Sequence, residues 1–233
     1  MTLSARRCTP LAALALALTA AACRPTTSAA PGPAPAASSA SGASAAAAQS
    51  EQAAIAKARA DSARYPYTAA DVHFMSSMIG HHAQAIHMAQ WAPSHGASPS
   101  VQVLAERIIN EQGDEIRTMQ QWLRDRRQPV PDATTMGMKM SMGGVEHVML
   151  MPGMLTDAQL AQLDSARGAQ FDRLFLTYMI QHHRGAVSMV KELFSTQGAG
   201  QDETVFKFAS DVNVDQTTEI ARMERMLAAM PPA

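Results

Sequence analysis

An internal repeat constrains the fold of this chain more than any other feature of its sequence. The segment "FMSSMIGHHAQAIHMA" at 74–89 recurs as "FLTYMIQHHRGAVSMV" at 175–190, and "EQGDEIRTMQQWL" at 111–123 recurs as "DQTTEIARMERML" at 215–227. Apolar residues in these segments follow the 3.6-residue period of an α-helix, which predicts two helical hairpins. Because one hairpin cannot bury its apolar face alone, the two are expected to pack as an all-α four-helix bundle.

Capping residues and prolines mark the expected helix ends. Thr68 followed by Asp71, and Thr156 followed by Gln159, resemble capping boxes at helix starts. The expected helices span about 68–92, 98–127, 160–194 and 202–229, after a weaker helical stretch at 51–64. No segment shows convincing apolar–polar alternation, so no β-strand is expected.

The amino-terminal residues resemble a bacterial export signal. Two arginines precede an apolar run at 11–18, and three alanines stand directly before Cys23. The run is too short to span a membrane, and small residues before a Cys resemble the lipobox of bacterial lipoproteins. We therefore expect a protein of the cell envelope or periplasm that contacts the membrane only through a lipid on Cys23, with ordinary secretion as the alternative. Cleavage removes Cys8, which leaves the folded domain without a disulfide or a thiolate metal site.

Composition along the chain predicts how it is organised. Residues 1–22 are expected to be the signal peptide, and 23–50 the lipidated Cys with an Ala/Pro/Ser-rich linker. Residues 51–66 form a short helical lead-in, and 67–230 form the four-helix bundle domain, which includes a Met-rich loop at 129–155 between the hairpins. A formal net charge of -1 provides no basic field, so nucleic acid is not expected as a partner.

Adjacent histidines occupy the same place in both repeats. A helical projection puts Met78, His81 and Met88 on the stripe that faces the bundle, and it puts His82 at the margin of that stripe. Adjacent residues point about 100° apart, so the two histidines cannot both face the bundle axis. On the partner helix, Glu115 faces inward and needs a donor, which the His-His pair can supply.

Three interpretations of these residues remain open. In the first, methionines fill the core and each His-His pair bonds to glutamate, as in a structural or interaction module without metal. In the second, the chain is a metal-dependent oxidoreductase, although no Glu stands three residues before any His, as a di-iron carboxylate centre would require. The third is a metal site of imidazole and thioether, a donor set that favours copper and, through thioether, Cu(I) over Cu(II). Its candidate ligands are His81, His82, His182, His183, Met78, Met88, Met179 and Met189, supported by Glu115, Glu219, Gln112 and Gln216.

The loop at 129–155 strengthens the copper interpretation. It contains "MGMKMSMGGVEHVMLMPGM", with methionines at alternate positions and one His. The chain has 17 Met but only six Phe, three Tyr and two Trp, a bias that ordinary core packing does not explain. We interpret this segment as a flexible loop whose exposed thioethers capture Cu(I), with the alternative that its methionines fold back over the bundle. The loop candidates are Met136, Met138, Met140, Met142 and His147.

These segments resemble the bacterial family known as domain of unknown function 305. The resemblance covers roughly 67–230 and lies in the paired His-His motifs, in "MPGML" and in "EIARMERML". It implies a ferritin-like four-helix bundle that is usually exported, and similarity to periplasmic copper-binding members implies copper binding or resistance. The repeat is imperfect at His87, whose equivalent is Ser188, and this argues against His87 as a ligand.

The sequence therefore predicts an envelope protein that binds copper for buffering, resistance or transfer. No catalytic base, nucleophile and oxyanion arrangement is evident, so we do not expect an enzyme. A copper-transfer protein is the expected protein partner, and the sequence does not determine the oligomeric state. If imidazoles with an ordinary pKa hold the metal, the affinity should weaken as the pH falls through about 6.

Overall fold

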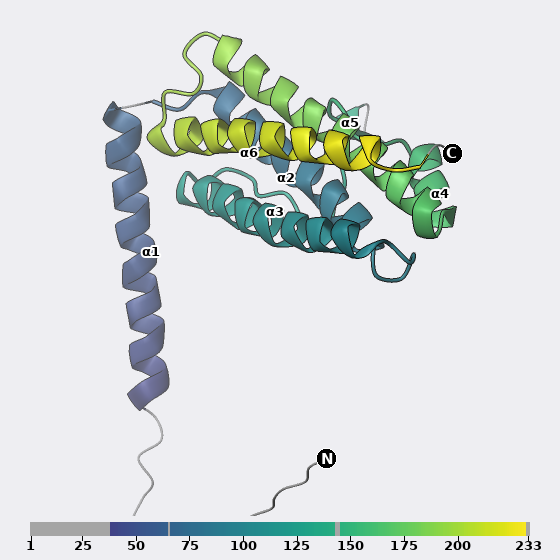
Figure 1. Ribbon diagram of the computed structural model, residues 1–233. Coiled ribbons are helices and arrows are strands. Elements are labelled where there is room, and N and C mark those ends of the chain that lie inside the picture. Colours follow the sequence, from purple (N-terminus) through teal and green to yellow (C-terminus); the bar gives the residue numbers. More distant parts are fainter. Residues whose placement is uncertain (1–37, 65, 143–144, 232–233) are drawn as a thin grey trace, which may run out of the picture. The chain divides into compact units, whose positions relative to one another are not determined.

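The structure is a computed structural model, and it describes residues 38–64, 66–142 and 145–231. Within these ranges the side chains of 38–45, 61–64 and 139–146 are not described. Four long helices lie side by side (Figure 1): α2 (Ala69–Ala89), α3 (Pro99–Asp125), α5 (Gly168–Ser195) and α6 (Glu203–Ala228). Helix α2 packs against α3, α5 packs against α6, and α2 also packs against α5. The predicted all-α class and the two repeated hairpins are confirmed, while the ferritin-like assignment stays a prediction.

The two hairpins are tied together by equivalent aspartates. Asp71 completes the predicted capping box at the start of α2 with Thr68, and its second carboxylate oxygen accepts a 2.7 Å hydrogen bond from the Gly200 N–H, in the α5–α6 connection. Asp172, the repeat equivalent on α5, accepts from the Ser98 N–H at 3.1 Å, at the start of α3. The aspartate of each hairpin therefore accepts a hydrogen bond from a backbone N–H in the connection between the two helices of the other hairpin. These bonds tie the hairpins together.

The helix expected at 160–194 is in fact two helices. The predicted capping box of Thr156 and Gln159 begins α4 (Asp157–Ser165), and α5 starts only at Gly168. Gly168 has a positive φ of 56°, and its N–H donates to the His95 carbonyl at 2.8 Å. This contact with the connection after α2 holds the chain out of the helical conformation, which the apolar period alone could not reveal.

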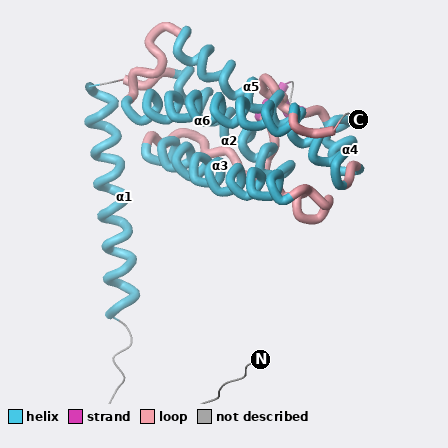
Figure 2. Tube along the Cα trace, viewed as in Figure 1, coloured by secondary structure: helices cyan, strands magenta, loops and turns pink. Residues whose placement is uncertain are grey.

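The segment interpreted as a flexible loop forms a β-hairpin, so the expectation of no strand was wrong. Strand β1 (Met138–Met142) pairs antiparallel with β2 (Val145–Met149), and Figure 2 shows these strands beside the helices. The register pairs Met138 with Met149 and Met140 with His147. Of the alternate methionines, Met138, Met140 and Met142 are therefore strand positions, whereas Met136 precedes the strand. An isolated hairpin is marginal in water, and this one continues from Gly137, whose N–H donates to the Gly80 carbonyl of α2 at 3.3 Å.

The amino-terminal part differs from its expected extent. Helix α1 (Ser38–Arg64) begins well before the lead-in helix expected from residue 51, and its first half is rich in alanine, the strongest helix former. The expected signal peptide and Cys23 lie outside the described residues. Within those residues, no helix combines the length and the apolarity that crossing a membrane requires.

The apolar core consists of two clusters, one toward each end of the bundle. The first includes Phe74, Met78 and Met189, and the second includes Met88, Met179 and Phe175. Along α2 and α5 the His-His pairs fall between the residues of these two clusters. The four histidines therefore form a polar layer in the middle of an otherwise apolar core.

Candidate metal centre

All four histidines of the two motifs are fully buried, with 0% of each residue exposed. His81 from α2 and His182 from α5 meet at the centre, where their ring centroids lie 3.8 Å apart and the ring planes are inclined by 42°. Within each motif the neighbouring rings lie farther apart, at 6.3 Å and 6.2 Å. The structure thus identifies His81 and His182 as the inner pair and directs His82 and His183 elsewhere.

The outer histidines contact the glutamates that the sequence predicted as their partners. His183 Nε2 donates to Glu219 Oε2 of α6 at 2.7 Å in a buried hydrogen bond. His82 Nε2 lies 2.8 Å from Glu115 Oε2 of α3, although this contact does not meet hydrogen-bond geometry. Such carboxylate contacts fix the orientation of an imidazole and raise its basicity as a ligand.

The inner pair has ring nitrogens without partners. His81 Nε2 donates to the Pro152 carbonyl at 3.0 Å, which leaves Nδ1 as the lone-pair nitrogen of the neutral ring, and this Nδ1 has no partner. Neither ring nitrogen of His182 has a hydrogen-bond partner of acceptable geometry. The His81 backbone raises the pKa of His182, but less than burial lowers it. Nδ1 of His82 and of His183 is unpartnered as well. Buried polar atoms are normally hydrogen-bonded, so these nitrogens fit a metal ion as the missing partner.

Burial holds the inner histidines in the neutral form. Desolvation lowers the pKa of His81 to about 3, and the nearby His82 adds to this effect. The pKa of His182 is also well below its usual value, first through desolvation and then because protons on both His182 and the adjacent His81 would repel each other. Neutral imidazole is the form that binds metal. The expectation that binding weakens as the pH falls through about 6 assumed an ordinary pKa, and it stays a prediction; a lowered pKa at His81 moves proton competition for this ring to more acidic solution.

Thioethers lie in the core on both sides of the histidine layer. Met78 and Met189 belong to the first apolar cluster, whereas Met88 and Met179 belong to the second, and all four are buried. Further buried methionines were not among the predicted ligands: Met75, Met119, Met151, Met154 and Met223. The repeat already offered a signal for two of these, because Met119 and Met223 occupy equivalent positions on α3 and α6.

The predicted glutamines are buried but poorly paired. Gln112 is 2% exposed, and neither its amide nitrogen nor its oxygen has a hydrogen-bond partner. Gln216 is 3% exposed, and its Oε1 has no partner. Each precedes Glu115 or Glu219 by three residues and so lies on the same helix face. These amides add further unsatisfied polar atoms to the core of the bundle.

The described methionines at the start of the hairpin contact the apolar core rather than the imidazoles. Met136 and Met138 are partly buried and pack against the first apolar cluster, whereas His147 is exposed. The side chains of Met140 and Met142 are not described. The described residues contain no group of three or more His, Cys, Asp or Glu side chains that could hold a metal ion. A metal at the inner pair would therefore have to be bound by few imidazoles, with or without thioether.

A loop covers the inner pair from one side. We call residues 151–155 the crossing loop. Its Pro152 carbonyl accepts from His81, and both the N–H and the carbonyl of Leu155 bond to the side chain of Gln84 at 2.7 Å and 3.0 Å. The loop lies so close to α5 that a Cβ atom on Gly185 would lie 1.9 Å from the Pro152 oxygen. The glycine is therefore required for this close approach.

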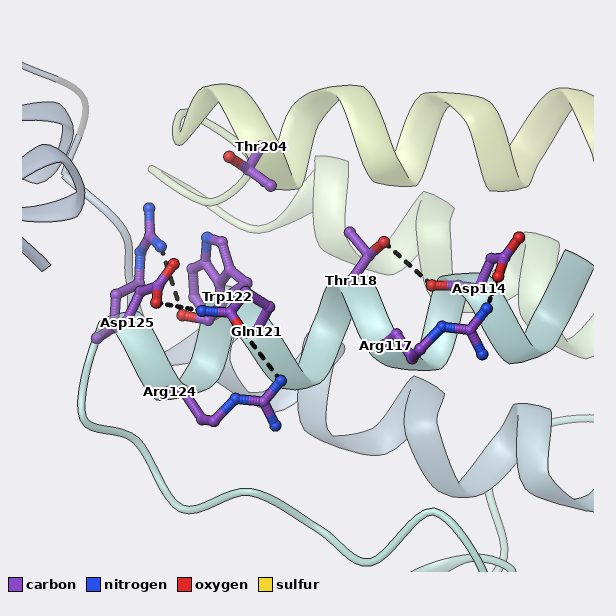
Figure 3. A pocket seen from close by; sticks show the side chains of 9 residues that line it. Asp114, Arg117, Thr118, Gln121, Trp122, Arg124, Asp125 and Thr204 are labelled. Atoms are coloured by element: carbon purple, nitrogen blue, oxygen red, sulfur yellow. Dashed lines mark hydrogen bonds and ion pairs between the residues drawn. The ribbon is translucent and has the colours of Figure 1, made fainter. Parts of the chain in front are cut away.

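A surface hollow of about 660 Å³ lies along α3. Figure 3 shows it lined by polar and charged side chains such as Arg117, Gln121 and Asp125, with Thr204 contributed by α6. Arg117 pairs with Asp114, and Gln121 donates to Asp125 at 2.6 Å. The lining has neither imidazole nor thioether, so we do not assign the metal centre to this hollow.

Comparisons with known proteins agree with the geometry of the bundle. The sequence profile of DUF305, a domain of unknown function, matches residues 71–227. A DUF305 protein from Streptomyces coelicolor is 30% identical, with a TM-score of 0.57, over 68% of this chain and 92% of that one. CopM in its Cu(II)-bound form is 31% identical (TM-score 0.52, 68% and 95% covered), and in its Cu(I)-bound form 29% identical (TM-score 0.50, 67% and 94% covered). No curated protein matches the chain. The family resemblance of the sequence is thereby confirmed, and the chain belongs to the DUF305 family.

Proposed function

We propose that this protein binds copper as Cu(I) at the inner pair, for buffering, resistance or transfer. The observation that carries the proposal is the contact of His81 with His182. Two neutral imidazoles meet at 3.8 Å in a fully buried layer, and ring nitrogens of both have no partner. A pair of unsatisfied imidazoles is costly to bury without a ligand. A metal ion would satisfy nitrogens that no described side chain reaches.

The surroundings of the inner pair favour the monovalent ion. Thioethers select Cu(I), and imidazole accepts either copper oxidation state. The nearest helix turns carry buried methionines, Met78 and Met179 three residues before the histidines. A single positive charge also costs less to place in a water-free core than a double one. The CopM structures with Cu(I) and Cu(II) support copper as the metal in this family.

The remaining groups have supporting roles in this proposal. Glu115 and Glu219 orient the outer histidines, which either complete the copper site or hold the helices in register. The Met-rich hairpin with its exposed His147 collects Cu(I) at the surface. We further propose that the chain is exported, is held at the envelope by lipid on Cys23 and hands copper to a transfer protein, without acting as an enzyme.

One observation favours a second candidate, a structural or interaction module without metal. His183 Nε2 and Glu219 Oε2 already share a hydrogen bond, and the described residues form no group of three or more His, Cys, Asp or Glu side chains that could hold a metal ion. In this alternative the His-Glu contacts only fix helix register. Metal analysis of the protein, purified without a His tag, separates the two functions.

The direct test removes the inner imidazoles. His81→Ala with His182→Ala should lower the Cu(I) affinity at least a hundredfold, and replacing His82 and His183 as well should abolish tight binding. The measurement is anaerobic competition with a Cu(I) chelator, with His87→Ala as the control from the same helix. Circular dichroism checks that each variant is folded.

A second variant keeps the test decisive if the histidine variants do not fold. Leucine in place of Met78, Met88, Met179 and Met189 preserves volume and apolarity, so the bundle should remain folded while the Cu(I) affinity falls at least tenfold. Parent-like affinity in both sets of variants would contradict a copper site in the bundle core.

A further inference from the structure

A small hollow opens between α2 and α5 beside the crossing loop. Its volume is about 80 Å³, and Ser77, Met151, Pro152, Met189 and Leu193 are among its lining residues. Pockets for organic ligands typically enclose 300–1,000 Å³. The hollow is therefore of a size for an ion with few waters rather than for an organic molecule.

The lining of the hollow combines soft donors with one negative charge. His73 contributes an exposed imidazole, whose Nε2 lies 3.5 Å from the buried Ser77 hydroxyl. Met151 and Met189 contribute thioethers that are 6% and 7% exposed, so they are near the surface without being free in solvent. Glu192, which is exposed, adds a carboxylate to the lining. Imidazole with thioether suits Cu(I), and the carboxylate attracts a cation.

The hollow and the inner pair are connected through α2, α5 and the crossing loop. His73, Ser77 and His81 follow one another at intervals of four residues, so they lie along one face of α2. Met189 follows His182 by seven residues on α5, which is about two helical turns or about 10 Å. The Pro152 carbonyl, from a residue that lines the hollow, accepts the hydrogen bond of His81 Nε2. The crossing loop thus separates the hollow from the buried imidazoles.

We propose that this hollow is a transit site for Cu(I), in which His73, Met151 and Met189 hold the ion on its way to or from the inner pair. Exchange of the ion with the inner pair rests on the proposed function, whereas binding of Cu(I) in the hollow does not. The ion exchanges ligands without a change of oxidation state, and displacement of the Pro152 carbonyl from His81 opens the way inward. A site on the path changes the rates of loading and release together and leaves the equilibrium at the inner pair unchanged.

The kinetic test uses the intact chain under anaerobic conditions. His73→Ala with Met151→Leu should slow both Cu(I) loading from a weak chelator and Cu(I) release to a strong one by at least tenfold. The equilibrium affinity of the inner pair should change less than about twofold, because loading and release slow together. The matched control is His87→Ala with Met226→Leu, which removes the same two groups outside the hollow. Loading at the parent rate in the hollow variant would overturn the proposal.

A second measurement separates failure of the hollow from failure of the proposed function. Silver(I), a soft monovalent ion, is titrated into protein with ¹⁵N-labelled histidine, and the ring nitrogens are followed by NMR. The His73 nitrogens should shift in the parent and also in the variant with His81→Ala and His182→Ala. Shifts of His81 and His182 without a shift of His73 refute the transit site alone. A shift of the His73 nitrogen signals while those of His81 and His182 stay unchanged supports a Cu(I) site in the hollow and refutes the site at the inner pair.

Discussion

At the scale of single residues, the buried imidazoles should make the metal-free protein sensitive to acid. The pKa of His81 is about 3 in the folded chain and about 6.5 in an unfolded one; that of His182 is lowered too. The unfolded state therefore binds more protons below pH 6.5, so the free energy of unfolding should fall as the pH falls, by up to about 1.4 kcal/mol per unit for each histidine. Urea denaturation between pH 7.5 and pH 4.5 measures this slope.

The matched variant for this prediction replaces both inner histidines by Gln. Glutamine does not titrate, so the variant should lose the part of the slope that His81 and His182 contribute, while its carboxylates titrate as in the parent. Equal slopes for parent and variant would show that the two imidazoles are not buried in the neutral form. Above pH 6.5 the two proteins should both show stability that varies little with pH.

At the scale of elements, the β-hairpin raises the question of whether its methionines bind metal or only pack. Leucine at Met136, Met138, Met140 and Met142 removes four thioethers while keeping apolar bulk, and it should lower the number of Cu(I) ions bound without unfolding the bundle. Competition titration and circular dichroism measure the two outcomes. The control is Met226→Leu with Met230→Leu near the end of α6. A stoichiometry equal to that of the parent assigns the hairpin methionines to packing.

At the scale of the whole molecule, the two aspartate ties should contribute to the coupling of the hairpins. Asp172→Ala leaves the Ser98 N–H without its acceptor, and Asp71→Ala removes both the Gly200 tie and the α2 capping box. Each should lower the free energy of unfolding by about 1–3 kcal/mol, with the larger loss for Asp71. Urea denaturation measures both. The control is Asp114→Ala, which breaks an exposed ion pair and should lower the free energy of unfolding by less than about 1 kcal/mol. A loss no larger than this for the Asp71 and Asp172 variants would contradict the role of the aspartates in tying the hairpins together.

Much of the fold followed from local signals in the sequence. The 3.6-residue period and the capping boxes at Thr68 and Thr156 depend on residues within one or two turns of each other, so the helix starts were predictable. The repeat also matched each glutamate to its His-His pair, because equivalent residues of the two hairpins take equivalent positions. The break before Gly168 was not predictable, because it depends on a contact with the distant His95. The β-hairpin did have a local signal, the alternate methionines at 136–142, which we interpreted as a loop.

The sequence by itself determined that two His-His motifs lie at equivalent depth in paired helical hairpins, because a duplicated period brings duplicated faces inward. It could not determine which histidine of each motif faces the other, since adjacent residues differ by about 100° and the helix rotation is set by packing. The tertiary structure placed His81 against His182 and turned His82 and His183 toward Glu115 and Glu219. It also placed Pro152, 71 residues from His81 along the chain, over the inner pair.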